Sequence, residues 1–254
     1  MKILIALYGV GRGVEYSEGS IKKYIIEPIV SMHETKIIYV RKNIPEFIYK
    51  RNKSGAPFES DYMEFEEGEH FNFDAFLYSK KFYDKHQDNY NSNKNLIYQL
   101  SKVHMLSKIV NMNHYDRIVF CRDDLIFYNP INWSNVFFLA KEGLFTTMWH
   151  WNAGISERFV VTNSKYAEII CNKLFEVKES IKYFGTLNGE YLQLYIVKKY
   201  NIPIYIDNIK FSRIRYNNEI ANEKFYFSFW RPFEFLNILF LYFKTHLYLL
   251  FFKH

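Results

Sequence analysis

Apolar and polar positions alternate along the chain in two patterns, which predict strands and helices in turn. Short runs rich in β-branched and aromatic residues are typical of buried strands, whereas apolar positions that recur every three or four residues predict helices. Strands are expected over residues 2–8, 36–40, 117–121, 143–148, 157–162 and 202–206, with extended pieces at 125–128 and 210–216. Helices are expected over residues 17–30, 96–110, 133–142, 164–175 and 190–200.

The order of these elements predicts an α/β fold. The chain opens with a strand, a loop, a helix and a second strand, which is the usual start of a parallel α/β sheet. Ser17 or Ser20 is expected to cap the first helix. Residues 41–72 are polar and predict an irregular insertion, for which we favour a solvated acidic face over a lid or acceptor loop. Short helices are expected within residues 71–95.

The net charge of the chain limits the kinds of molecule that it is expected to bind. The net charge of +6 and the pI near 9.0 favour an anionic partner, such as a nucleoside diphosphate, an acidic membrane surface or nucleic acid. No dense Lys/Arg block, RNA-binding signature or zinc-finger spacing is present, so nucleic acid is not expected. Cys121 and Cys171 lie in predicted elements without metal-ligand spacing, which indicates buried, reduced thiols in a cytoplasmic protein. The start of the sequence has no signal-peptide pattern, and secretion is not expected.

The segment from His114 to Pro130 carries the strongest candidate chemistry. Its buried strand ends in Arg122, Asp123 and Asp124, and open α/β sheets bind ligands at the carboxyl ends of their strands. We predict that Asp124 faces a Mg²⁺ or Mn²⁺ ion and that Arg122 either faces a phosphate or orients a carboxylate. Adjacent strand residues point in opposite directions, so Asp123 either joins the same ion after a turn or contacts the ribose or the donor sugar.

Two further groups of residues are candidates for a nucleotide diphosphate. Gly9, Gly11 and Arg12 follow the first strand, where backbone without Cβ atoms can approach phosphate closely. A merely flexible turn is an equal alternative, because the spacing matches no established phosphate-binding loop. Arg213 and Arg215 would lie on one side of an extended segment and could grip a diphosphate, or they belong to a basic surface strand.

A cluster of aromatic and amide side chains is a candidate for sugar binding. Trp149, His150, Trp151 and Asn152 follow a predicted strand and could stack on a sugar ring and bond to its hydroxyls, with ordinary packing at the rim as the alternative. Glu190 stands at a predicted helix start and is the candidate general base of an inverting reaction. The helix dipole alone would also favour a carboxylate there.

The run YDRIVFCRDDLIF resembles a motif of bacterial surface-polysaccharide glycosyltransferases, in which a Tyr-Asp pair opens a strand that ends in Arg, any residue, Asp and Leu. Three other parts of the chain agree with that family. They are the first strand with SIKKYIIEP, the IYQL helix before the motif, and Asn188-Gly189-Glu190 with residues 202–215. Many members have Pro where Asp123 stands here, and Arg where Phe120 stands.

The resemblance covers residues 1–216 and implies a GT-A-like domain, with a Rossmann-type mixed sheet flanked by helices. It implies a glycosyltransferase that uses a nucleoside-diphosphate sugar and a divalent metal, with Asp124 as the motif aspartate and Arg122 as its arginine. We expect the acceptor to be a cell-surface glycan or a lipid-linked molecule at the cytoplasmic membrane face. The alternatives are a nucleotidyl- or phosphotransferase that uses the same carboxylates, and a catalytically inactive, membrane-docked interaction protein.

Residues 217–254 form a separate tail whose segment 233–252 predicts an aromatic-rich amphipathic helix. Its predicted narrow polar stripe consists of Glu234, Asn237, Lys244 or Thr245, and Tyr248. We expect this helix to lie on a membrane, with Arg231, Lys244 and Lys253 attracting anionic lipid. Packing on its own domain or in a dimer is the main alternative, and a spanning helix is less favoured because of the polar residues.

Overall fold

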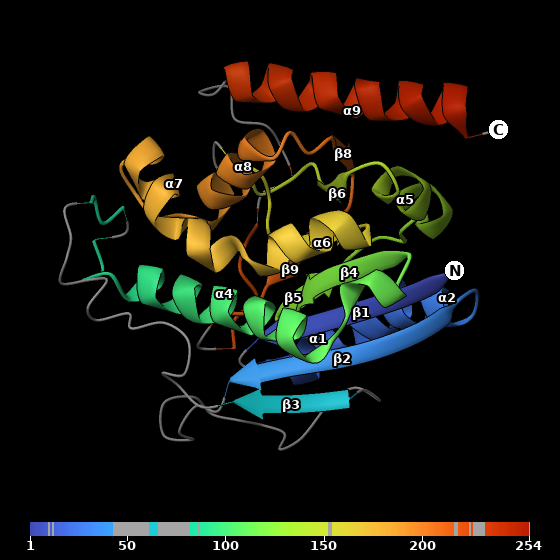
Figure 1. Ribbon diagram of the computed structural model, residues 1–254, viewed down its shortest axis with the longest axis horizontal. Coiled ribbons are helices and arrows are strands. Elements are labelled where there is room, and N and C mark those ends of the chain that lie inside the picture. Colours follow the sequence, from blue (N-terminus) through green and yellow to red (C-terminus); the bar gives the residue numbers. More distant parts are fainter. Residues whose placement is uncertain are drawn as a thin grey trace.

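A computed structural model describes most of the chain (Figure 1). The described residues are 1–9, 11, 13–42, 61–65, 82–85, 87–151, 154–215, 218–223, 225 and 232–253. For residues 41–42, 61–65 and 232–235 only the backbone is described. The predictions for Arg12, Asn152 and Arg231, and for most of residues 41–81, lie outside them.

A seven-stranded mixed sheet forms the centre of the molecule, in the order β3-β2-β1-β4-β7-β6-β8. Its strands are β1 (Lys2–Gly9), β2 (Glu34–Lys42), β3 (Asp61–Phe65), β4 (Arg117–Arg122), β6 (Leu144–Thr147), β7 (Phe159–Thr162) and β8 (Ile204–Asp207). Strand β7 runs antiparallel to both neighbours, and the other pairs are parallel. A second, antiparallel sheet joins β5 (Leu125–Phe127) to β9 (Phe211–Arg213). The carboxyl end of β4 therefore leads directly from the main sheet into the small one.

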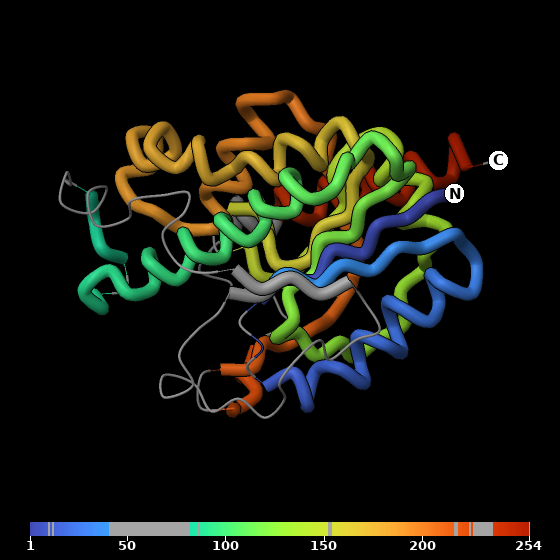
Figure 2. The backbone as a smooth tube through the Cα atoms, turned by 60° about the horizontal axis from the view of Figure 1, so that its bottom comes forward, coloured from blue at the N-terminus to red at the C-terminus, as the bar shows by residue number. Residues whose placement is uncertain are grey.

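Helices cover both faces of the main sheet (Figure 2). One face carries α4 (Asn91–Ile109), α6 (Ser164–Cys171) and α8 (Gly189–Lys199). The other carries α1 (Val14–Ile21), the π-helical turn Lys22–Ile26, α2 (Glu27–Val30) and α5 (Trp133–Ala140). The remaining helices are the 3₁₀ turns Met112–His114 and Lys173–Glu176, α7 (Val177–Phe184) and α9 (Pro232–Phe252).

Strand β1 shows why its sequence is apolar from Ile3 to Tyr8. Leu4, Ala6 and Tyr8 pack against one helical layer, and the residues between them pack against the other. Successive side chains of a strand point to opposite faces, so a central parallel strand is buried on both sides. The continuous apolar run that predicted this strand is a direct consequence of its central position.

The predicted fold class is confirmed: the chain forms a Rossmann-type mixed sheet flanked by helices, followed by a C-terminal helix. The two cysteines are free and buried, as expected. Within the segment predicted to be irregular, residues 61–65 form an edge strand instead. Helix α7 was not predicted, and the described residues 82–85 and 87–90 contain no helix of the kind expected there.

The predicted start of the first helix is wrong. Helix α1 begins at Val14, and its N-cap is Gly13, whose φ of 62° suits a residue without a Cβ atom. The Ser17 hydroxyl is buried and donates to the Asp123 carbonyl at 2.5 Å. The Ser20 hydroxyl donates to the Ser17 carbonyl at 2.9 Å. These hydroxyls therefore tie α1 together and to the end of β4 instead of capping the helix.

Helix α9 packs along the edge strand β8 (Figure 1). The buried Thr245 hydroxyl accepts a hydrogen bond from the Ile206 amide at 3.1 Å and donates to the Leu241 carbonyl at 2.8 Å. The Tyr248 ring lies 5.3 Å from the Tyr205 ring, centroid to centroid. Of the predicted polar stripe, Thr245 and Tyr248 therefore face the domain, whereas Asn237 and Lys244 are exposed. Among the described residues, no helix is long and apolar enough to cross a membrane.

We expect Thr245→Val to lower the free energy of unfolding by about 1–2 kcal/mol, because it leaves a buried edge-strand amide without its acceptor while keeping the side-chain shape. Urea denaturation measures the change. The control is Thr35→Val, whose hydroxyl donates only to the nearby His33 carbonyl at 2.9 Å in a partly exposed position. Equal stability of wild type and Thr245→Val would show that this hydrogen bond does not hold the helix.

Candidate functional site

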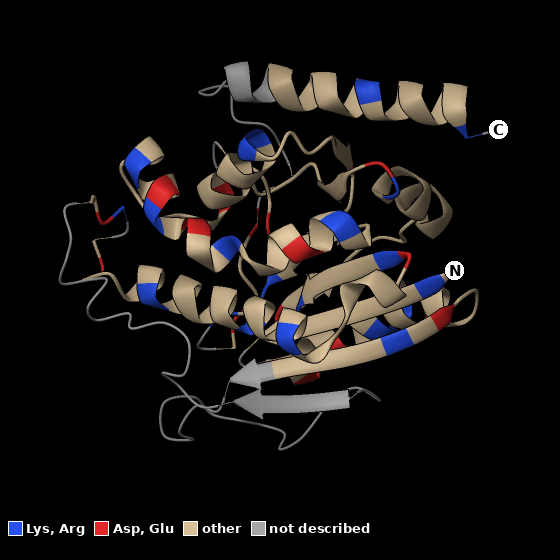
Figure 3. Cartoon of the chain, viewed as in Figure 1, with Lys and Arg blue, Asp and Glu red and all other residues tan. Residues whose placement is uncertain are grey.

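The order in which the chain adds strands to the sheet reverses between β1 and β4. From β1 the chain continues through β2 to β3 on one side, and β4 begins the other half of the sheet. In open α/β sheets such a switch point leaves a crevice at the carboxyl ends of the two strands. Charged residues lie towards the ends of the central strands rather than along their lengths (Figure 3). The predicted motif, Arg122 to Asp124, lies at this switch point.

Asp123 is enclosed by the end of β1. Its Oδ2 atom accepts hydrogen bonds from the Gly11 amide at 2.8 Å and the Tyr39 hydroxyl at 2.7 Å. A Cβ atom at Gly9 would lie 1.7 Å from Asp123 Oδ1, so only glycine lets the two strand ends come this close. The structure therefore brings Gly9 and Gly11 to the predicted site, where both contact Asp123 of the same chain.

The environment of Asp123 disfavours its charged form. Burial and then the neighbouring Asp124 carboxylate raise the pKa of Asp123 to about 6, although the hydrogen bonds from Tyr39 and Gly11 and the charge of Lys102 act in the opposite direction. The Asp123 side chain therefore changes its charge close to neutral pH.

Asp124 and Arg122 form a two-point ion pair. Arg122 donates from Nε to Asp124 Oδ1 at 2.9 Å and from Nη2 to Oδ2 at 2.6 Å, and both side chains are largely buried. Arg122 Nη1 also donates to Gln99 at 3.1 Å and lies 3.8 Å from Glu157 Oε1. Burial lowers the pKa of Arg122, but these carboxylates outweigh it and raise the pKa overall. Arg122 therefore orients a carboxylate, one of the two roles expected for it, and this carboxylate is Asp124, which was expected to face a metal ion.

A second charged cluster lies next to the first, because Arg158 follows Glu157 in the chain. Arg158 Nη2 lies 3.3 Å from Glu190 Oε1, and Arg158 Nη1 lies 3.6 Å from Glu223 Oε1. Arg213 Nε donates to Glu223 Oε1 at 2.8 Å. Burial raises the pKa of Glu223, but the His150 contact and the two guanidinium groups outweigh it and lower the pKa to about 2.

Four residues of this network were missed by the sequence interpretation: Gln99, Glu157, Arg158 and Glu223. One local signal was available, since Glu157 and Arg158 stand together directly before the apolar strand β7. Both are buried, which is rare for charged residues without partners. Gln99 and Glu223 had no such signal, because helical periodicity does not show which polar side chain points at a distant strand end.

The aromatic cluster packs tightly against neighbouring segments. The Trp149 indole donates to the Asn208 side chain at 2.8 Å, and the Trp151 indole donates to the Thr147 carbonyl at 2.8 Å. His150 has a φ of 64°, and its Nδ1 atom lies 3.4 Å from Glu223 Oε2. The structure thus joins His150 to the second charged cluster and shows rim packing for both indoles, while sugar stacking stays a prediction.

The two arginines predicted to act together differ in their surroundings. Arg213 is held by Glu223 and its side chain is 35% exposed. Arg215 is exposed, and its amide donates to the Glu219 carbonyl at 2.8 Å. Of the predicted phosphate ligands, these two therefore present accessible positive charge.

A divalent metal does not fit the arrangement of the two aspartates. Among the described side chains, no group of three or more His, Cys, Asp or Glu could hold a metal ion. Both oxygens of Asp124 bond to Arg122, and Asp123 Oδ2 accepts from two donors. A cation at Asp124 would have to displace the guanidinium group, so we derive no chemical step through a metal.

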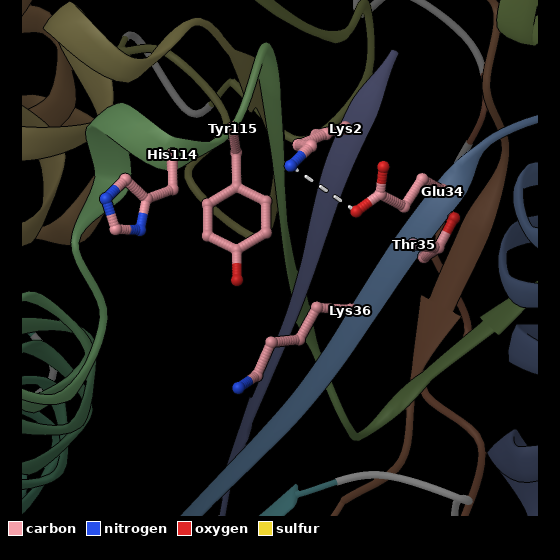
Figure 4. A pocket seen from close by; sticks show the side chains of 6 residues that line it. All are labelled: Lys2, Glu34, Thr35, Lys36, His114 and Tyr115. Carbon is pink, nitrogen blue, oxygen red and sulfur yellow. Dashed lines mark ion pairs between the residues drawn. The ribbon is translucent and has the colours of Figure 1, made fainter.

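A surface pocket of about 420 Å³ lies at the opposite, amino-terminal ends of β1 and β2 (Figure 4). Its lining residues are Lys2, Glu34, Thr35, Lys36, His114 and Tyr115. Lys2 Nζ lies 3.6 Å from Glu34 Oε1, and both side chains are more than half exposed. None of the predicted ligand-binding residues lines this pocket, which is therefore separate from the switch point.

Comparisons with known proteins find similarity in solved structures only. No family model matches the sequence, and no curated protein matches it. The apo form of the glycosyltransferase GlyE of Streptococcus pneumoniae TIGR4 superposes with a TM-score of 0.43 and 16% identity over 80% of this chain. A second GlyE structure superposes with a TM-score of 0.40 and 15% identity over 79% of this chain. The chain covers 45% and 43% of the lengths of those two chains, and similarity at this level says nothing about its activity.

We expect Asp124→Asn to lower the free energy of unfolding at neutral pH by about 3 kcal/mol, because a neutral amide leaves the buried Arg122 guanidinium incompletely compensated. Urea denaturation measures the loss. The control is Glu34→Gln, which removes the exposed ion pair to Lys2 and should change stability little. Similar small effects in both variants would contradict a structural role for the buried pair.

The raised pKa of Asp123 predicts a specific pH dependence. The folded state binds this proton more tightly than the unfolded chain, so stability falls as the pH rises from about 4 to about 6. Asp123→Asn should remove a fall on the order of 2 kcal/mol across this range while keeping an acceptor for Gly11 and Tyr39. Denaturation of both proteins between these pH values measures the difference. Asp207→Asn is the control and should keep the wild-type profile.

Proposed function

We propose that this chain is a glycosyltransferase that moves a sugar from a nucleoside-diphosphate donor to an acceptor. The observation that carries the proposal is the position of the Arg122-Asp123-Asp124 motif at the switch point of the sheet, beside the glycine-containing loop after β1. Such a crevice suits a nucleotide, and the sequence motif resembles that of surface-polysaccharide glycosyltransferases. The mixed sheet is of the kind that this resemblance implies.

The accessible cations are suited to the donor diphosphate. Arg213 is partly exposed beside Glu223 and Arg215 is exposed two residues later in the chain, and planar guanidinium groups bind phosphate oxygens through paired hydrogen bonds. Arg122 is less available, because Asp124 and Glu157 already surround it. We infer that Arg213 and Arg215 hold the diphosphate while Arg122 maintains the shape and charge balance of the crevice.

Glu190 is the proposed general base for an inverting transfer. Its backbone amide bonds to Asn188 Oδ1 at 3.0 Å, and its carboxylate is oriented by Arg158. A base has to lie within hydrogen-bonding reach of the acceptor hydroxyl from which it takes the proton. The donor sugar would then lie between Glu190 and the diphosphate site, near the cluster of Trp149, His150, Trp151 and Asn152.

We further propose that the acceptor is a cell-surface glycan or a lipid-linked molecule, met at the cytoplasmic face of the membrane. The support is the sequence resemblance together with the positive net charge of +6. The resemblance also implies a Mg²⁺ or Mn²⁺ ion, which would have to displace the partners that the two aspartates have in the structure.

Donor binding tests the proposal. Thermal-shift and calorimetric titrations with UDP- and GDP-sugars, with and without Mn²⁺, should reveal a stabilising donor, and its hydrolysis should release a nucleoside diphosphate. Arg215→Ala should weaken donor binding roughly tenfold without changing the melting temperature, because it removes an exposed, charge-assisted contact. Lys198→Ala removes a lysine from α8 and is the matched control.

Two outcomes would overturn the proposal. Absence of binding and hydrolysis with every common sugar nucleotide would exclude the donor class. Release of pyrophosphate instead of a nucleoside diphosphate would assign the same crevice to nucleotidyl transfer.

A further inference from the structure

The outward face of α9 is a continuous apolar stripe. Its side chains recur every three or four residues, and each is between 53% and 68% exposed. They are Leu236, Phe240, Phe243, Leu247, Leu250 and Phe251. Residues at this spacing lie on one side of a helix, so the exposed apolar groups form a single surface along α9. Figure 1 shows α9 as the outermost element on its side of the domain.

The opposite face of the same helix holds it to the domain. Ile238 and Thr245 are buried, and the Tyr248 ring packs 6.0 Å from the Phe138 ring of α5, centroid to centroid. The helix is therefore anchored by one face, and its other face is left for a partner outside the domain. Exposed apolar surface of this extent marks an interaction site in most soluble domains.

Charge favours one kind of partner for this stripe. Residues 236–253 contain Lys244 and Lys253, both exposed, and no Asp or Glu. A second copy that docked in register through the same stripe would bring like lysines together, since the acidic residue of α9, Glu234, lies roughly three turns from Lys244. An anionic lipid surface suits this face, because its acyl region accepts the phenylalanine rings and its headgroups attract Lys244, whereas Lys253 Nζ donates to Asn135 of α5.

We propose that the outward stripe of α9 docks on an anionic lipid bilayer, with the helix lying in the plane of the headgroups. The inference is independent of the proposed glycosyl transfer. The apolar residues enter the boundary between headgroups and acyl chains, and Lys244 lies among the headgroups. The buried Thr245 side of the helix keeps the domain attached above the lipid surface.

This mode of docking also orients the switch point. Helix α9 runs antiparallel to β8, since Thr245 lies beside Ile206 and Tyr248 lies beside Tyr205. The amino-terminal end of α9 is therefore on the side of the carboxyl ends of the parallel strands (Figure 1). A bilayer along α9 would place the crevice at the side of the domain, opening along the lipid surface.

Vesicle co-sedimentation of the full chain tests the proposal. We expect binding to vesicles containing roughly one quarter phosphatidylglycerol in phosphatidylcholine, and weaker binding to phosphatidylcholine alone. The double variant Phe240→Ser/Phe243→Ser should lower the partition coefficient at least about tenfold on the anionic vesicles, because two apolar anchors are lost. Lys244→Glu should lower it roughly tenfold on anionic vesicles and leave binding to neutral vesicles nearly unchanged.

The matched control is Phe175→Ser/Tyr183→Ser, which removes two aromatic side chains that are 60% and 62% exposed away from α9. It should bind vesicles like the wild type. Circular dichroism and melting temperature show whether each variant is folded, and Phe243→Trp gives a second reading, since the indole emission should shift to the blue with vesicles. Failure of the wild type to bind anionic vesicles would overturn the proposal. A concentration-dependent dimer that the α9 double variant abolishes, without vesicle binding, would assign the stripe to a second copy.

Discussion

The pairing of Arg122 with Asp124 is the interaction on which the carboxyl end of the sheet depends. Asp123, Asp124 and Glu157 are all buried within this small region, and isolated buried carboxylates would be strongly unfavourable. The Arg122 guanidinium compensates two of them, and the Gly11 amide and the Tyr39 hydroxyl bond to the third. The carboxyl end of the sheet at the switch point thus contains a compensated charge network.

This network explains which parts of the site could be predicted from the sequence. The motif was found because its residues are consecutive and follow a recognisable buried strand. Its contacts with Gln99 and Tyr39 were not predicted, because these residues come from α4 and β2, far from the motif in the chain. The sequence left open whether Arg122 holds a phosphate or orients a carboxylate, and the structure shows it bonded to the Asp124 carboxylate. Local patterns identify the charged residues, and long-range packing selects their partners.

The fold likewise contains elements that the sequence predicted and elements that it did not predict. Central strands such as β1 were predicted closely, because burial on both faces imposes a continuous apolar run. The edge strand β3 has the sequence DYMEF, in which Asp61 and Glu64 interrupt the apolar residues, so it has no continuous apolar run. The start of α1 was misplaced because Gly13 caps it through backbone geometry, while the serines that resemble caps bond elsewhere. The sequence therefore indicates which residues are buried more clearly than it indicates where a helix or strand begins and ends.

Thr245 has a consequence for the rotation of α9 about its own axis. A helix that is apolar on nearly every side has little reason to prefer one angular setting, because many of its faces could pack on an edge strand equally well. The hydrogen bond from the Ile206 amide to the Thr245 hydroxyl selects one setting. A shift of this threonine by a single position would turn the helix by about 100°. One hydroxyl group thus determines which phenylalanine side chains point away from the protein.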